Sequence, residues 1–386
     1  MKLPGNATPS ALYNTRMDIN GTSCRSIELG DDGWSVHVID QRKLPHEFAV
    51  LRLTSLTDAA GAIRTMAVRG APLIGATAAY GICLALRADA TDASLDEACR
   101  TLRATRPTAV NLRWALERMQ RRLREMPGAE RVETAYAEAA AICDEDVATN
   151  RAIGEHGLTL LQALHTRKTA GEPLRILTHC NAGRLAAVDW GTALAPVYLA
   201  HHAGIPVHVW VDETRPRNQG ALTAWELAQS GVPHTVIVDN AGGHLMQHGL
   251  VDCCIVGSDR TTAAGDVCNK IGTYLKALAA HDNAVTFYVA LPGSTIDWSI
   301  SDGLAEIPIE ERDAREVTHV SGRSAEGRVE SVGVFSDSTR TANYAFDITP
   351  SRLVTALITE RGICPATREG LASLYPEHRE ARAAGR

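Results

Sequence analysis

Short apolar segments alternate with helical segments through the second half of this chain, and this alternation limits the possible fold more than any other feature. The segments expected to form strands are Leu174 to Thr178, Val207 to Val211, Thr235 to Val238, Asp252 to Gly257 and Thr286 to Ala290. The helices expected between them lie near Gly191 to Ala203, Ala221 to Ser230, Leu245 to Gly249 and Ile271 to His281. Strands that are apolar on both faces and joined by crossover helices form parallel sheets. We therefore expect a doubly wound, Rossmann-like domain.

The first part of the chain has a different pattern. Residues Trp34 to Ile39 alternate weakly, as short strands do, whereas the Ala-rich sequence that follows Ser55 has helical spacing. The helical stretches are Asp58 to Met66, Leu73 to Arg87, Leu95 to Ala104, Val110 to Met126 and Glu133 to Leu164. Because 386 residues exceed what one hydrophobic core usually supports, we predict an α/β protein of two domains. A small β and helical N-terminal domain covers residues 1–165, and a Rossmann-like parallel-sheet domain covers residues 166–386.

Three further elements are expected near the C-terminus. The charged stretch from Asp302 to Arg328 is typical of a long surface excursion, and Val329 to Phe335 has the composition of a strand. Thr349 followed by Pro350 resembles a helix start, with Thr as the N-cap and Pro in the first turn. We predict a helix from there to about Glu360.

Charge and cysteine content exclude several classes of protein. The net charge of −6 does not favour nucleic-acid binding. The nine cysteines contain no C-x-x-C pair, which favours a reduced compartment over a disulfide framework or a zinc ribbon. No window has eighteen uninterrupted apolar residues, and Met1 to Tyr13 is unlike a secretory signal. We expect a cytoplasmic protein that binds neither membrane nor nucleic acid and needs no metal or organic cofactor.

Polar clusters follow nearly every predicted strand. In an open parallel sheet, ligands bind outside the carboxyl ends of the strands, so these clusters predict an active site there. Cys180 follows the first strand, and it is either an acid–base thiol or a buried structural cysteine. Asp259 follows the fourth strand; it is either a general acid held protonated in a dry pocket or the partner of the adjacent Arg260 or a helix cap.

Three basic residues lie next to predicted helix starts, where free backbone N–H groups favour anions. Arg69 precedes Gly70, Ala71 and Pro72 at a junction between two helices, and Arg106 precedes a second helix start. Lys270 follows Asn269 just before a helix of the C-terminal part. The alternative is ordinary capped helices with solvated side chains. These three basic residues favour a small phosphate as the ligand. The two arginines also suggest that the N-terminal domain closes over the edge of the sheet.

These motifs together resemble the methylthioribose-1-phosphate isomerase family. The matching stretches are Met66 to Pro72, Arg106 to Leu112, Thr178 to Gly183, Glu213 to Pro216, Gln219-Gly220, Leu222 to Leu227, Asp259-Arg260, Gly265-Asp266, Asn269 to Tyr274, Ser294 to Asp297, Ile307 to Arg312 and Ala345 to Pro350. They occur in the family's order from about Leu44 to Gly362. Each stretch alone is weak, but the set is specific.

The resemblance implies an aldose–ketose isomerase of methionine salvage that converts 5-methylthioribose 1-phosphate into 5-methylthioribulose 1-phosphate, and 5-deoxyribose 1-phosphate is a second candidate substrate. It implies a homodimer and no cofactor. By the same resemblance, Cys180 and Asp259 match the catalytic pair. Seven residues match substrate-binding positions: Arg69, Gly70, Ala71, Arg106, Gln219, Asn269 and Lys270.

Two other functions stay open. Some relatives of this family act on ribose 1,5-bisphosphate, and more distant ones are non-catalytic regulatory subunits of a nucleotide-exchange complex that serves a translation initiation factor. The presence of both Cys180 and Asp259 argues for the enzyme, because a scaffold has no need of the pair.

Overall fold

The computed structural model describes residues 17–19 and 22–379, so the interpretation of Met1 to Tyr13 lies outside the described residues. Two small antiparallel sheets open this part of the chain. Strand β1 (Met17–Ile19) pairs with β2 (Thr22–Cys24), and β4 (Val36–Ile39) lies between β3 (Ile27–Leu29) and β5 (Val50–Leu53). Val36 and Val38 alternate along β4 and bury their side chains in the helical core that follows. The predicted small β region is confirmed.

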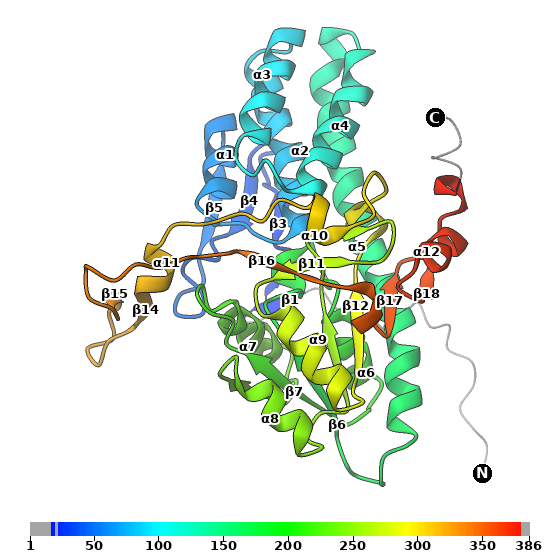
Figure 1. The fold of residues 1–386 in the computed structure, drawn as a ribbon. Coiled ribbons are helices and arrows are strands. Elements are labelled where there is room, and N and C mark those ends of the chain that lie inside the picture. Colours follow the sequence, from blue (N-terminus) through cyan, green and yellow to red (C-terminus); the bar gives the residue numbers. More distant parts are fainter. Residues whose placement is uncertain (1–16, 20–21, 380–386) are drawn as a thin grey trace, which may run out of the picture.

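Five helices form the rest of the N-terminal part (Figure 1): α1 (Leu56–Arg64), α2 (Ala71–Ala88), α3 (Asp92–Arg103), α4 (Val110–Arg124) and α5 (Gly128–His165). Side-chain caps fix two of the starts, since the oxygen of Ser55 accepts from the N–H of Asp58 and that of Thr91 from Ser94. Helix α2 packs against the four others. It has the length and composition of a membrane span, with a mean hydropathy of 1.4, but 78% of it is buried inside the protein, as expected of a core helix.

Helix α5 connects the two parts of the molecule. Its first half contributes Ala139 and Ile142 to the helical core. Its second half packs Ile153 and Leu161 into the core that covers one face of the large sheet. Because one continuous helix serves both cores, the predicted domain boundary at residues 165/166 stays a prediction.

Gly157 lets α5 approach helix α6 (Ala195–His202) closely. A Cβ at this position would lie 2.3 Å from Cγ of Pro196. We expect Gly157→Ala to lower the free energy of unfolding by about 1–2 kcal/mol, because overpacking costs more than the roughly 1 kcal/mol that Ala gains over Gly in a helix. Chemical denaturation of the purified variant measures this change.

Gly61 in α1 supplies the matched control. Nothing lies within 4 Å of a Cβ added there. Gly61→Ala should therefore stabilise the protein by up to ~1 kcal/mol through helix propensity alone. Equal effects of the two substitutions would show that the α5–α6 contact is not the constraint.

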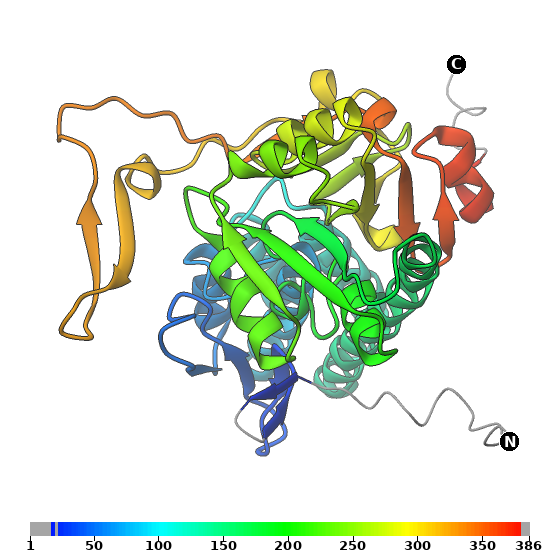
Figure 2. The ribbon, with the colours of Figure 1, turned by 90° about the horizontal axis from the view of Figure 1, so that it is seen from below.

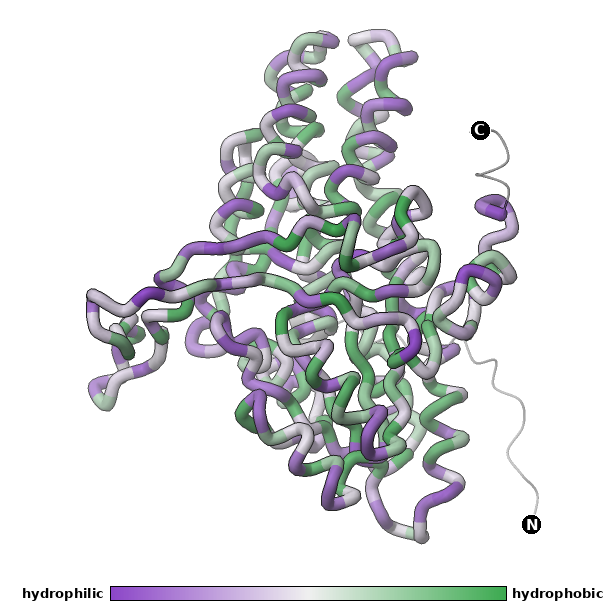
Figure 3. Tube along the Cα trace, viewed as in Figure 1, coloured by the Kyte–Doolittle hydropathy of each residue, from purple (hydrophilic) through white to green (hydrophobic). Residues whose placement is uncertain are grey.

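The C-terminal part is built on a seven-stranded sheet in the order β18-β17-β12-β9-β6-β7-β8 (Figures 1 and 2). All neighbouring pairs are parallel except β17 with β18. The strands are β6 (Leu174–Thr178), β7 (Val207–Asp212), β8 (His234–Ile237), β9 (Cys253–Val256), β12 (Thr286–Ala290), β17 (Ala356–Thr359) and β18 (Gly362–Cys364). Figure 3 shows hydrophobic residues in the interior of this part. The α/β class and the Rossmann-like sheet are confirmed.

The strand order places a switch point between β6 and β9. From β6 the chain first builds outward through β7 and β8, then returns to the other side of β6 to add β9, β12 and β17. The connecting helices are α6, α7 (Gln219–Gln229), α8 (Ala241–Gln247) and α9 (Thr273–Asp282). At such a point two adjacent loops diverge, which leaves a crevice at the carboxyl ends of the strands. Cys180 follows β6 and Asp259 follows β9, so both predicted catalytic residues lie beside this crevice.

A second, four-stranded sheet corrects one expectation. It has the order β13-β10-β11-β16, with β10 (Arg260–Thr262), β11 (Val267–Lys270), β13 (Ile296–Asp297) and β16 (Phe346–Thr349). Asn269 and Lys270 therefore lie on a strand, one turn before α9. The predicted helix from Thr349 is wrong: Thr349 pairs with Val267 in the sheet, and strand β17 follows. Pairing of two buried strands outweighs the local cap signal.

The expected surface excursion is present. It contains α10 (Gly303–Glu306), α11 (Arg315–Thr318) and the hairpin of β14 (His319–Arg323) with β15 (Val329–Gly333), which projects away from the body in Figure 2. Helix α12 (Arg368–Leu374) follows β18. The base of the excursion returns across the crevice, where Ile307 and Pro308 line a pocket.

Candidate active site

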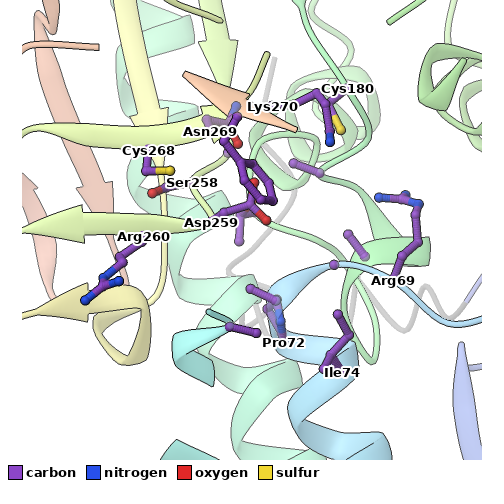
Figure 4. Close-up of a pocket in the computed structure, with 18 of the residues that line it drawn as sticks. Arg69, Pro72, Ile74, Cys180, Ser258, Asp259, Arg260, Cys268, Asn269 and Lys270 are labelled. Atoms are coloured by element: carbon purple, nitrogen blue, oxygen red, sulfur yellow. The ribbon is translucent and has the colours of Figure 1, made fainter. Parts of the chain in front are cut away.

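All nine predicted site residues line one pocket between the carboxyl edge of the large sheet and the start of α2 (Figure 4). The predicted catalytic residues are Cys180 and Asp259, and the predicted binding residues are Arg69, Gly70, Ala71, Arg106, Gln219, Asn269 and Lys270. Arg69 and Arg106 come from the N-terminal part, whereas Cys180 and Asp259 come from the large sheet's loops. The expected closure of the helical part over the sheet edge is therefore present.

Backbone hydrogen bonds hold Cys180 in an unusual conformation. Its φ is 66°, in the left-handed region that residues other than glycine seldom occupy. The N–H of Cys180 donates to Oγ1 of Thr214 at 2.8 Å, and its carbonyl accepts from Oγ1 of Thr223 at 2.8 Å. Positive φ at a non-glycine residue persists only where surrounding contacts enforce it, and such residues cluster at functional sites.

The thiol of Cys180 faces two opposing influences. Burial raises the pKa of Cys180, while the charges of Arg69 and Lys270 lower it and that of Asp259 raises it. Burial prevails, so the pKa lies above its ordinary value and the group is a neutral thiol at neutral pH. The environment does not create a standing thiolate.

Asp259 points into the same space as Cys180 in Figure 4. Burial raises the pKa of Asp259 above its ordinary value, although Lys270, Arg106 and Arg69 lower it. The alternative of an ion pair with its neighbour does not hold, because the guanidinium of Arg260 points away and bonds Asp297 at 2.5 Å. A carboxyl in a dry pocket with a raised pKa is suited to donate a proton.

Buried cations surround the pocket. Lys270 is 8% exposed, its Nζ donates to the carbonyl of Ala345 at 2.9 Å, and it lies 4.7 Å from the centre of the Phe346 ring. Burial lowers the pKa of Lys270, and Cys180 and Asp259 raise it when they are ionised. Arg106 reaches Glu310 of the excursion at 3.1 Å. A carboxylate thus already offsets Arg106, whereas the ammonium of Lys270 donates to a neutral carbonyl.

The uncharged part of the lining supplies further donors and an apolar wall. Gly70, with a φ of 89°, is the N-cap of the 18-residue helix α2, and a Cβ there would lie 2.3 Å from the carbonyl oxygen of Ala186. The glycine therefore lets the start of α2 approach the sheet edge, where its free N–H groups favour an anion. The side-chain oxygen of Gln219 has no hydrogen-bond partner among the described residues. The apolar lining includes Met66, Pro72, Ile74, Ile307, Pro308 and Phe346.

Two buried side chains, one that lines the pocket and one outside it, were not predicted. Asn181 bonds Arg69 through its side-chain and backbone oxygens, and its amide donates to Glu226 in the middle of α7. Glu226 is fully buried. No local signal marks it, because a Glu inside a helix is usually solvated. Glu226 lies within Leu222 to Leu227, one of the stretches that carry the family resemblance, but the resemblance assigned it no role.

His179 belongs to a second buried network. Its Nδ1 lies 2.9 Å from Asp212, and its Nε2 lies 2.8 Å from the carbonyl of Ile271. His179, Asp212 and Asp239 are a group of potential metal ligands within 4.8 Å of one another. The ammonium of Lys276, however, lies 3.2 Å from Asp212 and also donates to the carbonyl of Asp239. Lys276 already supplies a cation there, and the expectation that no metal is needed stays a prediction.

Comparison with known proteins finds one family model and relatives that share one name. The family model "Initiation factor 2 subunit family" matches residues 67–366. Methylthioribose-1-phosphate isomerase of Methylorubrum populi is 66% identical over 95% of this chain and 100% of the relative. The protein of that name from Rhodospirillum rubrum is 64% identical over 94% of each chain.

Two solved structures share the fold. The crystal structure of 5-methylthioribose 1-phosphate isomerase from Pyrococcus horikoshii superposes with a TM-score of 0.78 at 38% identity, over 96% of this chain and 99% of the other. A structure described as translation initiation factor eIF-2B, subunit delta, from A. fulgidus gives 0.75 at 39% identity, over 92% and 100%.

Proposed function

We propose a function for this chain from the premise that it belongs to the initiation factor 2 subunit family, whose model matches more than half of its length. The chain is an aldose–ketose isomerase that converts 5-methylthioribose 1-phosphate into 5-methylthioribulose 1-phosphate. One observation in the structure supports this activity most strongly: Cys180 and Asp259 share a pocket with several cations.

The chemistry needs an acid first. The anomeric oxygen of the substrate carries phosphate, so the ring has no free aldehyde form and must be opened by protonating the ring oxygen. We assign this proton to Asp259, because burial raises the pKa of its carboxyl and so favours the protonated form. Opening leaves a cation at C1 that the phosphate oxygen stabilises. Once hydrogen has moved from C2 to C1, the C2 hydroxyl returns its proton to Asp259 and becomes the ketone.

Cys180 has two possible roles in the hydrogen transfer. As a base it removes the C2 proton, passes through a phosphoenolate and returns the proton to C1. As a neutral thiol it polarises the reaction centre in a dry site while hydrogen moves as hydride. The raised pKa of Cys180 supports the second role, since a protonated thiol is a poor base. Both routes move one hydrogen from C2 to C1 within the substrate with no net oxidation or reduction, so neither requires a redox cofactor.

The charges around the pocket support a substrate with one phosphate. Arg69 and Lys270 have no carboxylate hydrogen-bond partner among the described residues. A 5-phosphate would need a second group of cations, but Arg215 and Arg217, the basic residues of the loop after β7, do not line this pocket. Arg217 pairs with Glu316 at 2.7 Å, and Arg215 bonds the carbonyls of Pro216 and Val317. The apolar wall suits a methylthio group better than a second dianion.

We expect purified protein to turn over methylthioribose 1-phosphate best, with 5-deoxyribose 1-phosphate within about 10- to 100-fold in kcat/KM. The two differ by an apolar methylthio group, and a hydrophobic pocket discriminates on that scale by roughly 1–3 kcal/mol. Ribose 1-phosphate and ribose 1,5-bisphosphate should react more slowly. Ketose formation is followed directly for each substrate.

The same panel tests the alternatives. Preference for the bisphosphate would replace the substrate and keep the reaction. No turnover of any member by folded protein would favour the regulatory function of the initiation-factor relatives. We also propose that the enzyme is a cytoplasmic homodimer, on the basis of its family, and sedimentation of the full chain tests the dimer.

A further inference from the structure

Arg69 is a buried cation to which no anionic group among the described residues bonds directly. It is 6% exposed, and its two terminal nitrogens bond the backbone and side-chain oxygens of Asn181, both of which are neutral. Its Nε has no hydrogen-bond partner among the described residues. A buried guanidinium needs a countercharge. Either the bound substrate or a more distant carboxylate must provide it.

Asn181 connects Arg69 to that carboxylate. Its Oδ1 accepts from Arg69, and its Nδ2 donates to Oε1 of Glu226 and to Oγ1 of Thr223 at 3.0 Å. Glu226 is fully buried, and a Cβ added to Gly183 would overlap its carboxylate. The packing therefore fixes one amide between the guanidinium and the carboxylate.

The other groups that face Glu226 are also buried. Its second oxygen accepts from the N–H of Leu185 at 3.4 Å. Arg184, which stacks on Tyr198 at 4.7 Å, supplies a second positive charge, and the Tyr198 hydroxyl faces the carboxyl from α6. Asp189 lies 3.8 Å from Arg184 and offsets part of that charge.

From this geometry we infer that Glu226 is a positioning residue that controls how strongly Arg69 holds the substrate phosphate, because its charge reaches Arg69 through Asn181 and competes with the bound anion. This inference rests on the proposed function, in which Arg69 contacts the phosphate. It adds a coupling: binding of a dianion and protonation of Glu226 favour each other.

The direction of the coupling follows from charge. Burial raises the pKa of Glu226 to about 7, while Asn181, Arg69 and Arg184 lower it. An anion beside Arg69 weakens this positive influence and raises the pKa further. Protonated Glu226, present below pH 7, leaves Arg69 fully available. Ionised Glu226 above pH 7 offsets Arg69, so the protein should take up protons on binding near pH 7 and bind anions less tightly as pH rises.

Sulfate is the probe, because it remains a dianion over the whole range and is not isomerised. Calorimetry of sulfate binding to the full-length protein, in buffers of different ionisation heat, should show proton uptake near pH 7. A coupling of about one pKa unit would weaken sulfate binding by about five- to tenfold between pH 6 and 9. Lys270, Asp259 and Cys180 also face the pocket, and their titration contributes equally to the variants compared below.

Two substitutions isolate Glu226. Glu226→Gln keeps the shape of the side chain and is neutral at every pH. Apart from the titration of the other pocket residues, this variant should bind sulfate at pH 9 about as tightly as the wild type does at pH 6. It should also lose the proton uptake near pH 7. Asp146→Asn is the matched control: burial raises the pKa of Asp146 to about 7 as well, but it does not line the active-site pocket. This variant should keep the wild-type pH dependence.

The inference is overturned if Glu226→Gln keeps the wild-type pH dependence, or if the wild type takes up no protons near pH 7. The second result decides the matter even when the variant does not fold. Both measurements use sulfate alone and need no turnover. Failure of the proposed isomerase activity would instead appear in the substrate panel, so the two failures are distinguishable.

Discussion

Cys180→Ser should reduce kcat for methylthioribose 1-phosphate by about a hundredfold or more, the scale expected when an acid–base or polarising group at the reaction centre is removed. The hydroxyl is smaller and far less acidic than the thiol, whereas the backbone bonds to Thr214 and Thr223 are unchanged. The fold should therefore be kept. Single-turnover assays at saturating substrate measure the effect on the chemical step.

Cys24→Ser is the matched control, since Cys24 is also partly buried but lies outside the pocket. It should leave kcat near the wild-type value. Substrate deuterated at C2 separates the two roles of Cys180 in the wild type. Exchange of this deuterium with solvent indicates a base, whereas hydride transfer requires its complete retention at C1. Wild-type activity of Cys180→Ser would remove the thiol from the mechanism.

Asp259→Asn should be at least as damaging, because an amide cannot protonate the ring oxygen. We expect a loss of kcat of about a hundredfold or more. In the wild type the active form is protonated Asp259, so activity should fall as pH rises through the raised pKa of this group. The residual activity of Asp259→Asn should lack this decline.

Stability and activity should separate in this variant. A carboxyl whose folded pKa is raised binds more protons when folded than unfolded, so it destabilises the fold as pH rises above its unfolded pKa. Asn carries no charge, so the thermal midpoint of Asp259→Asn should be no lower than that of the wild type at neutral pH.

Asp252→Asn is the control: Asp252 directly precedes β9, bonds Lys168 at 2.9 Å and lies outside the pocket. It should lose stability and keep activity. The reverse result would contradict the assignment of Asp259 as the acid.

The periodicity of the sequence was sufficient to predict the parallel sheet. Helices and strands of the C-terminal part follow from local hydrophobic patterns, which depend on residues close together in the chain. The same locality explains the error at Thr349. Its helix signal is local, but Thr349 pairs with Val267, a residue far away in sequence. Pairing between distant strands is decided by the tertiary structure.

The candidate site shows the same division. The sequence by itself determined that Cys180 and Asp259 follow strands of one sheet, because each comes after an apolar segment, and a parallel sheet presents all its carboxyl ends at one edge. It did not determine the strand order. Only the tertiary structure placed β6 beside β9, so that these two loops diverge at the switch point. The link between Glu226 and Arg69 is likewise decided by the tertiary structure. The side-chain amide of Asn181 bonds both residues, so the link depends on three segments that are distant in sequence and meet in space.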